Sequence, residues 1–282
     1  MLNALTIDVE DYFQVSAFDE IVRFEDWSRY ESRVERNTDS LLSLLTDKEI
    51  KATVFVLGWI ADRYPKLVRD IQKEGHEIAC HGYAHRLIYE HSRGFFRDDT
   101  RRAKAILEDI TGEKVIGYRA PSYSIIKESL WALDILVEEG FEYDSSIFPI
   151  RHDRYGIPNG KRFPHSISRN RDKCIIEFPL STIRFCGTNF PLAGGGYFRL
   201  FPYWLIRWGL NRINKAEKQG FIFYLHPWEI DPYQPRFNPG YISRFRHYVN
   251  LDRTREKLKR LISDFRFTTV KMVLANQDLI VL

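Results

Sequence analysis

The sequence predicts an α/β fold built on a mainly parallel β-sheet. Short apolar runs, typical of strands buried on both faces, alternate with longer segments whose apolar residues recur at helical spacing. Glycine ends several helical segments, and no tract rich in Gly and Ser interrupts the alternation. Because strand–helix–strand connections are right-handed, we expect the carboxyl ends of the strands to share one edge of the sheet.

The first elements are a strand, a helix and a second strand. Residues 5–7 form a short β-branched run, and residues 33–46 carry apolar positions at helical spacing. Residues 52–58 are a continuous apolar run that Gly58 stops, as expected for a buried strand.

The same alternation continues to residue 144. Proline stands in the first turn of the next helix, and a glycine closes each helix in this part of the chain. The expected elements are helices 65–75, 95–110 and 128–139 and strands 76–80, 115–118 and 141–144.

The second half of the chain is less regular. Residues 149–172 are rich in Pro, Gly, Arg and His, and we expect a long loop over the open edge of the sheet. Strands are expected at 175–179 and 221–225, and the second of them delivers His226. The glycines at 194–196 allow close approach of the backbone, but no Lys-Ser/Thr pair follows, so we reject a phosphate loop.

Composition and charge limit the classes of function. The 282 residues include 42 Lys and Arg against 38 Asp and Glu, and a net charge of +4 does not indicate a nucleic-acid partner. Residues 252–264 predict a basic amphipathic helix, interpreted as a solvated face, with weak attraction to an anionic surface as the alternative. No linker or repeat is present, so one domain is expected over 1–282.

The predicted location is the cytoplasm. No apolar run approaches the roughly 20 residues of a membrane span, and the chain enters a strand-like segment directly from Met1. Three cysteines without paired spacing suit a reducing compartment. We therefore expect at most a peripheral association with the inner membrane surface, and the sequence leaves the oligomeric state open.

Two histidines and a group of acidic residues suggest a metal site. His81 and His85 follow a predicted strand, and one helical turn between them would point both imidazoles the same way. Asp8, Glu10 and Asp11 follow the first strand. Catalytic zinc usually takes three protein ligands and keeps a position open for water, so one of these carboxylates would complete the site.

Five short motifs stand at the ends of predicted strands. They are, in chain order, Thr6-Ile7-Asp8-Val9-Glu10-Asp11, His81-Gly82-Tyr83-Ala84-His85, Arg119-Ala120-Pro121, Tyr143-Asp144-Ser145-Ser146 and Leu225-His226. In these motifs the chain resembles the polysaccharide deacetylases of the NodB-homology type, carbohydrate esterase family 4, over residues 3–230. It looks closest to the branch of peptidoglycan deacetylases and allantoinases, and within it to exopolysaccharide deacetylases associated with exosortase systems. The resemblance implies a distorted, incomplete (β/α) barrel with a C-terminal extension at 227–282 packed on it.

The resemblance also implies the ligands of a metal ion. Glu10, with Asp11 as its rival, would join His81 and His85 around one divalent cation. Zn²⁺ is the first choice, and Co²⁺, Ni²⁺ or Fe²⁺ also suit such a ligand set. The second motif departs from the family at Gly82, where Ser or Thr is usual.

The remaining motif residues would carry out the proton transfers. Asp8 would be the general base, held by an ion pair with Arg119. His226 would be the general acid, and Asp144 stands where it could hydrogen-bond to that imidazole.

The implied reaction is hydrolysis of an N-acetyl group on an N-acetylhexosamine unit of a bacterial polysaccharide or its precursor. Tyr123 and Trp228 stand next to motif residues, and their rings are candidates for contact with the sugar. Two alternatives stay open: an allantoinase-like amidohydrolase of a small cyclic amide or ureide, and a catalytically silent glycan-binding subunit. Neither the sugar, its linkage nor the accepted chain length follows from the sequence.

Overall fold

The computed structural model describes residues 1–169 and 173–281, and within these residues most strands belong to one sheet. The strands are β1 Leu2–Val9, β2 Thr53–Val56, β3 Glu77–Cys80, β4 Gly117–Tyr118, β5 Tyr143–Asp144, β6 His165–Arg169, β7 Lys173–Glu177, β8 Thr182–Phe185, β9 Thr188–Pro191, β10 Ile222–Leu225 and β11 Arg266–Thr268.

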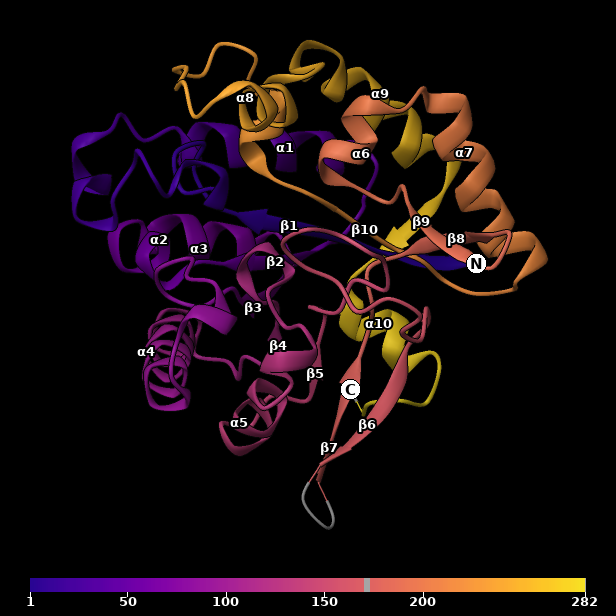
Figure 1. Ribbon diagram of the computed structural model, residues 1–282, viewed down its shortest axis with the longest axis horizontal. Coiled ribbons are helices and arrows are strands. Elements are labelled where there is room, and N and C mark those ends of the chain that lie inside the picture. Colours follow the sequence, from indigo (N-terminus) through magenta and orange to yellow (C-terminus); the bar gives the residue numbers. More distant parts are fainter. Residues whose placement is uncertain (170–172, 282) are drawn as a thin grey trace.

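The large sheet is mainly parallel and curves around the centre of the molecule (Figure 1). Its strand order is β10-β1-β2-β3-β4-β5-β7-β6, and β11 also pairs with β1. Only β6 and β7 are antiparallel within it, while β8 and β9 form a separate hairpin among the described strands. Because the strand order ends at β10 and β6 without joining them, the barrel is incomplete, which confirms the predicted fold class.

Helices α1 to α5 lie on the outer side of this curved sheet (Figure 1). They confirm the predicted alternation in the first half of the chain, with one correction: Gly58 is the first residue of a helix and not the end of a strand. The helices are α1 Val34–Thr46, α2 Gly58–Arg63, α3 Pro65–Lys73, α4 Arg93–Thr111, α5 Ala132–Glu138, α6 Gly195–Leu200, α7 Tyr203–Asn211, α8 Tyr241–Tyr248, α9 Leu251–Asp264 and α10 Val270–Ala275.

The expected loop at 149–172 is wrong in part. Residues 165–169 form β6, which pairs antiparallel with β7 at the edge of the sheet. This edge strand contains a single apolar residue, Ile167, so its sequence lacks the apolar run by which a buried strand is recognised. The expected loop also includes residues 170–172, which lie outside the described residues.

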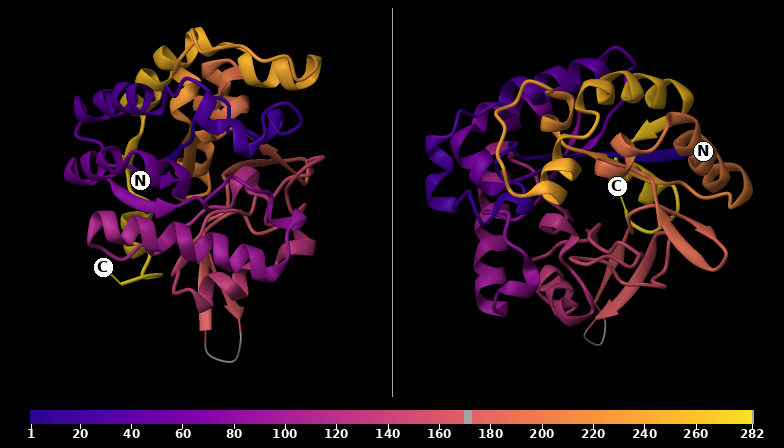
Figure 2. Two further views of the ribbon diagram at one scale, coloured as in Figure 1. Left: turned by 90° about the vertical axis from the view of Figure 1, so that its left-hand side faces the viewer. Right: turned by 45° about the horizontal axis from the view of Figure 1, so that its top comes forward.

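The C-terminal segment returns to the first strand. β11 pairs in parallel with the beginning of β1, with Leu2 opposite Arg266. Both views of Figure 2 show this yellow segment beside the indigo N-terminal strand. α9 lies next to α1, since Arg255 Nη1 donates a 2.6 Å hydrogen bond to Ser40 Oγ. Among the described helices, none has the length and apolar character needed to cross a membrane.

Gly117 in β4 leaves room for a neighbouring aromatic ring. A Cβ at this position would lie 2.1 Å from the Tyr143 ring, whose hydroxyl donates a partly buried 2.8 Å hydrogen bond to Glu77 Oε1. We expect Gly117→Ala to lower the free energy of unfolding by about 1–3 kcal/mol, the usual cost of overpacking a core.

Urea denaturation of this variant would measure the effect. Gly94→Ala is the control, because its Cβ would meet only Ser92 Oγ at 4.0 Å and the position lies in α4. That change should be neutral or mildly stabilising, since alanine favours a helix over glycine. Equal stability of Gly117→Ala and the wild type would contradict the packing described for β4.

Candidate active site

The carboxyl ends of the parallel strands bring the predicted motif residues to one cavity. Asp8 is the penultimate residue of β1, Glu10 lies just beyond that strand, His81 follows β3, and His226 follows β10. These four residues line a cavity of about 630 Å³. Arg119, which follows β4, is completely buried beneath it. The expectation that strand ends gather the functional side chains is met.

Glu10, His81 and His85 form the cluster best suited to a metal ion. Each offers one ligand atom, and these atoms lie within 4.8 Å of one another. His85 Nε2 is 2.7 Å from Glu10 Oε2, and all three side chains are buried. His81 Nδ1 lies 2.8 Å from the Arg119 carbonyl, so its Nε2 remains for a ligand.

The electrostatics of this cluster fit a cation. Glu10 Oε2 is buried, and His85 Nε2 lies 2.7 Å from it. Burial would raise the pKa of Glu10, but His85, His226 and His81 lower it well below its usual range, so the carboxylate is charged. Burial lowers the pKa of His81 to about 4, which keeps that imidazole neutral as a ligand must be. A two-histidine, one-carboxylate set suits Zn²⁺ and neighbouring divalent metals.

The histidine motif is a loop and not the helical turn that we expected. His85 has a φ of +51° and Gly82 a φ of +71°, and both values lie in the left-handed region. The loop carbonyls of Gly82 and Tyr83 accept the first two N–H groups of α2, from Gly58 and Trp59. A Cβ at Gly82 would lie 3.1 Å from Asp99 Oδ2, which gives this departure from the family motif a local reason.

Asp8 is held by a buried guanidinium. Arg119 Nη1 donates to Asp8 Oδ1 at 2.6 Å and to Thr6 Oγ1 at 2.7 Å. Arg119 Nη2 and Nε donate to the Oγ and carbonyl oxygen of Ser145, so the guanidinium is fixed by β1 and by the residue that follows β5. The second carboxylate oxygen, Asp8 Oδ2, points to His226, whose Nε2 lies 3.8 Å away.

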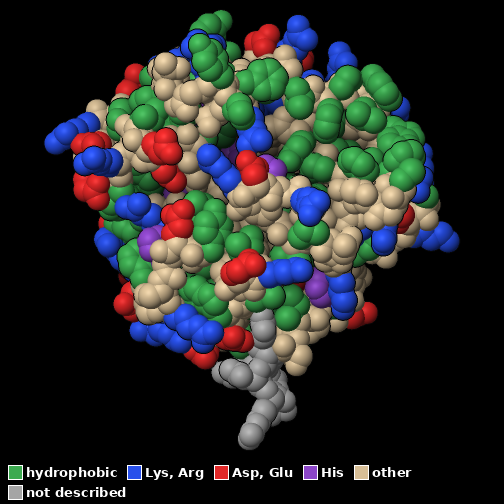
Figure 3. Space-filling view, in the orientation of Figure 1, with side chains coloured by type: hydrophobic (Ala, Val, Ile, Leu, Met, Phe, Trp, Pro, Cys, Tyr) green, Lys and Arg blue, Asp and Glu red, His purple; other side chains and the backbone are tan. Residues whose placement is uncertain are grey.

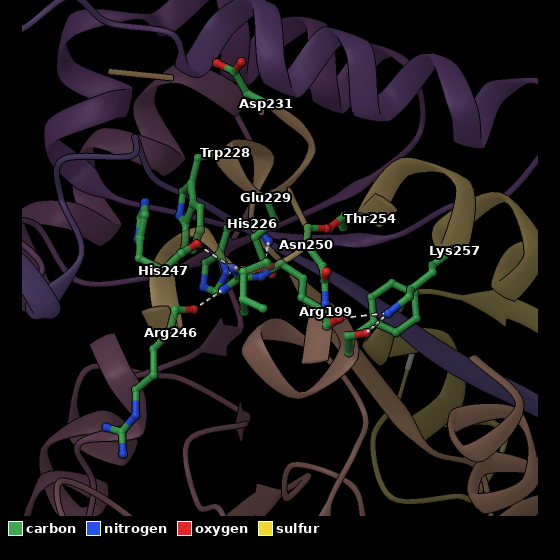
Figure 4. Close-up of polar contacts among 12 residues, drawn as sticks. Arg199, His226, Trp228, Glu229, Asp231, Arg246, His247, Asn250, Thr254 and Lys257 are labelled. Carbon is green, nitrogen blue, oxygen red and sulfur yellow. Dashed lines mark hydrogen bonds and ion pairs between the residues drawn. The ribbon is translucent and has the colours of Figure 1, made fainter. Parts of the chain in front are cut away.

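His226 has a different partner from the one expected. Its Nδ1 lies 2.6 Å from Glu229 Oε1, and Arg199 Nε donates to the other oxygen of Glu229 at 2.7 Å (Figure 4). Burial would lower the pKa of His226, but the carboxylates of Glu10, Glu229 and Asp8 raise it to about 9. The predicted role of Asp144 as this partner is therefore wrong. The acidic residue three positions after His226, in the first turn of a short helix, was the signal that sequence reasoning missed.

Trp228 contacts Glu10 of the candidate metal cluster directly. Its Nε1 donates to Glu10 Oε1 at 3.1 Å, and its ring stacks on His226 and on His247 (Figure 4). Tyr123 packs edge-on against Tyr224 in the cavity wall. Both predicted aromatic residues line the cavity, but each is more than nine-tenths buried. Contact of the two rings with a sugar stays a prediction.

Asp11 points away from the cluster. Its Oδ2 accepts hydrogen bonds from Ser32 Oγ at 2.8 Å and from the backbone N–H groups of Arg33 and Val34 at 2.8 and 3.1 Å. Its Oδ1 accepts from the Tyr12 N–H at 3.0 Å. Asp11 thus anchors the start of α1, which corrects its placement as a rival metal ligand.

Asp144 belongs to a second acidic pair below the cavity. Its Oδ1 accepts a 2.5 Å hydrogen bond from Ser146 Oγ, and Glu177 Oε1 accepts the Ile147 N–H at 3.0 Å. Burial raises the pKa of Asp144 to about 6, and burial together with the Asp144 charge raises the pKa of Glu177 well above its usual range. The pair therefore retains a proton in the folded protein at pH values where both groups would be ionised in the unfolded chain.

This retained proton makes stability depend on pH. Through this pair the folded state binds more protons than the unfolded state above about pH 4.5, so the contribution of the pair to the free energy of unfolding falls as pH rises, by at most about 1.4 kcal/mol per pH unit for one proton. We expect Glu177→Gln to remove much of that slope, since an amide can donate to Asp144 without titrating. Urea denaturation at about pH 5, 6 and 7 measures it. An unchanged slope in the variant would contradict the shared proton.

Two family profiles match most of the chain between them. The profile described as polysaccharide deacetylase matches residues 18–137, and the profile of a domain of unknown function, DUF3473, matches residues 145–275. The first match includes His81 and His85, and the second includes His226 and Glu229. The fold thus combines residues from both matched regions in one cavity.

Individual relatives agree with the first profile. YheN of Bacillus subtilis is 34% identical over 127 residues, which are 42% of this chain and 44% of YheN. The peptidoglycan-N-acetylglucosamine deacetylase of Bacillus cereus is 31% identical over 98 residues, 34% of this chain and 36% of that protein. The matched part of the chain spans less than half the length of either relative.

A solved structure shows that the likeness extends over the whole fold. The crystal structure of a Mycobacterium smegmatis protein superposes with a TM-score of 0.62 at 20% identity, over 98% of this chain and 91% of its own. Residues 18–137 of this chain therefore match the polysaccharide deacetylase family, and the fold of the whole chain is similar to that of the Mycobacterium smegmatis protein.

Proposed function

We propose that this protein is a metal-dependent hydrolase that removes N-acetyl groups from an N-acetylhexosamine unit of a bacterial polysaccharide or its precursor, in exopolysaccharide biosynthesis. One observation carries the proposal: the Glu10, His81 and His85 cluster lies in the same cavity as a carboxylate, Asp8, bonded to a buried arginine. Binding a glycan without reaction requires neither group, and the match of residues 18–137 to the polysaccharide deacetylase profile supports an amide substrate.

Glu10, His81 and His85 would hold one divalent cation, for which Zn²⁺ is our first choice. Such a cation lowers the pKa of a water molecule towards neutrality and polarises the carbonyl oxygen of an amide. The protein orients the ligands around it: Trp228 Nε1 holds Glu10, and the Arg119 carbonyl holds His81.

Asp8 would act as the general base. Its Oδ1 is occupied by Arg119, so Oδ2 is the atom that takes a proton from the attacking water. The water oxygen bonds to the carbonyl carbon of the acetyl group, and a tetrahedral intermediate forms. Arg119 keeps the carboxylate in place through this transfer.

His226 would act as the general acid. Its Nδ1 is fixed by Glu229, so Nε2 faces the cavity, 3.6 Å from Glu10 Oε1 and 3.8 Å from Asp8 Oδ2. When the carbon–nitrogen bond of the intermediate breaks, Nε2 donates its proton to the departing nitrogen. The products are acetate and the free amine.

We further infer that residues 1–282 act as one unit in the cytoplasm, peripheral to the inner membrane. The segment at 227–282 supplies Trp228 and Glu229 to the cavity and packs β11 on β1, which supports a single domain with this extension on the core. All three cysteines are free, and Cys174 and Cys186 are exposed, as suits a reducing compartment.

Acetate release would test the function. Purified protein is stripped of metal, reloaded with Zn²⁺, Co²⁺, Ni²⁺ or Fe²⁺, and assayed on N-acetylglucosamine oligomers and on allantoin. Acetate from the oligomers that depends on added metal supports the proposal. Turnover of allantoin alone favours a small cyclic substrate, and binding of oligomers without acetate release under any metal favours a silent glycan-binding subunit.

A further inference from the structure

An exposed apolar surface lies beside the mouth of the cavity. Six large hydrophobic side chains from the end of α6, from α7 and from α8 are between 45% and 93% exposed. Figure 3 shows hydrophobic side chains gathered over these three helices. We name this surface the apolar face and define it by Leu200, Trp204, Trp208, Tyr241, Ile242 and Phe245.

Exposed hydrophobic residues are concentrated in this part of the chain. Of the fourteen large hydrophobic residues that are exposed among the described residues, nine fall within two segments, 178–216 and 232–251. These segments make up only 59 of the 282 residues. Singly exposed hydrophobic residues are normal, but a concentration of this kind marks an interaction surface.

The same two segments also carry an excess of positive charge. They contain no Asp or Glu and eight Lys or Arg residues. Because the whole chain carries +4, the remaining 223 residues carry a net charge of −4. The cations are Arg184, Arg199, Arg207, Arg212, Lys215, Arg236, Arg244 and Arg246.

Carboxylates of neighbouring elements only partly neutralise these cations. Glu229 pairs with the buried Arg199 at 2.7 Å, and Asp264 of α9 pairs with Arg207 at 2.9 Å. Asp153 lies 3.7 Å from Arg246, and Glu217 lies 3.9 Å from Arg212. Arg244 is exposed and, among the described residues, has no ion pair within 4 Å. Positive charge therefore remains at the border of the apolar face.

We propose that the apolar face docks on the surface of a lipid bilayer that contains anionic headgroups. Tryptophan and tyrosine favour the boundary between headgroups and hydrocarbon, and leucine, isoleucine and phenylalanine gain by entering the apolar side of it. Arginines bordering such a surface are attracted by its negative potential. A polyanion dissolved in water would satisfy the arginines but would leave the six apolar side chains in water.

The cavity opens on this surface. Leu200, Tyr241, Ile242, Phe245 and Arg246 belong both to the apolar face or its border and to the cavity lining. Docking therefore places the mouth of the cavity against the lipid. An acetylated sugar joined to a membrane anchor could enter the cavity there. The inference about an anchored sugar rests on the proposed function, whereas the docking on lipid does not.

Sedimentation with vesicles tests the docking. Wild-type protein is mixed with vesicles of phosphatidylcholine alone or of phosphatidylcholine with phosphatidylglycerol, over a range of NaCl concentrations. We expect binding to the anionic vesicles that weakens as salt screens the arginines. No binding to either vesicle, equal binding to both, or binding to a DNA fragment without binding to vesicles would overturn the proposal.

Matched variants locate the surface. Trp204→Ser/Trp208→Ser should lower the vesicle partition coefficient at least about tenfold, and Arg244→Gln about fivefold, the effect of one cation at an anionic surface. The controls, Phe95→Ser on α4 and Arg69→Gln on α3, are exposed side chains of the same kinds outside the two segments. Acetate release from soluble oligomers separates this result from the proposed function, because the two tryptophans and Arg244 lie outside the catalytic cavity. Equal binding by control and face variants, or a dimer that buries the face and binds no vesicles, would refute the proposal.

Discussion

Asp8→Asn should reduce acetate release by about 10²–10⁴-fold while leaving metal binding intact, the effect expected for loss of a general base. Asparagine keeps the shape of the side chain and can still accept the hydrogen bond from Arg119 Nη1 through its carbonyl oxygen. Its other terminal atom is an amide nitrogen, which cannot take a proton from water. Initial rates with N-acetylglucosamine oligomers and metal content after dialysis would measure the two effects separately.

Asp11→Asn is the matched control for this variant. Asp11 is equally buried, lies three residues away and is engaged with the start of α1. An asparagine at that position can still accept backbone hydrogen bonds, so turnover and metal content should stay close to those of the wild type. Metal loss in Asp8→Asn comparable to that of a ligand variant, or a turnover loss in Asp11→Asn as large as in Asp8→Asn, would show that the roles are misassigned.

His85→Ala should remove both metal and activity. The change deletes one of three ligands and leaves Glu10, a buried carboxylate, without its closest partner at 2.7 Å. We expect the variant to lose bound Zn²⁺ on dialysis and to show turnover at the background of the assay. Metal analysis of the dialysed protein and calorimetric titration with Zn²⁺ would measure the loss.

A histidine outside the cavity provides the comparison. His91 stacks on Phe95 at the start of α4, away from the cluster, so His91→Ala should keep both metal and turnover. Full metal occupancy in His85→Ala would remove this residue from the ligand set. Loss of metal in both variants would indicate binding by histidines in general and not by the cluster.

Short-range patterns in the sequence were sufficient for most of the fold. Buried parallel strands are continuous apolar runs, so β2, β3 and β10 were recognisable, as was the helix that begins at Pro65. The edge strand β6 was not, because only its Ile167 is apolar. The C-terminal strand β11 is three residues long and pairs with residues more than 260 positions away, a contact that no local pattern announces.

The part of the site that the sequence motifs contain was predictable. Asp8, Glu10 and the two histidines of the loop meet as expected, because strand order and handedness place strand ends together. The partner of His226 was assigned to Asp144, but Glu229 holds it. Which carboxylate pairs with His226 depends on the conformation of a short helix after β10. Likewise, the left-handed backbone at His85 replaces the helical turn that its spacing suggested, and spacing alone cannot distinguish the two.

The pairing of β1 on both edges has a consequence for synthesis of the protein. The strand that carries Asp8 is synthesised well before two of its hydrogen-bonded neighbours, residues 222–225 and 266–268. At the usual 5–20 residues per second, about 10–50 s separate the first strand from the last. Until then the nascent chain exposes an apolar strand with one edge unpaired and a carboxylate cluster at its end. Assembly of the centre is thus among the final events of folding, and a chaperone that shields the early strand would raise the yield of active protein.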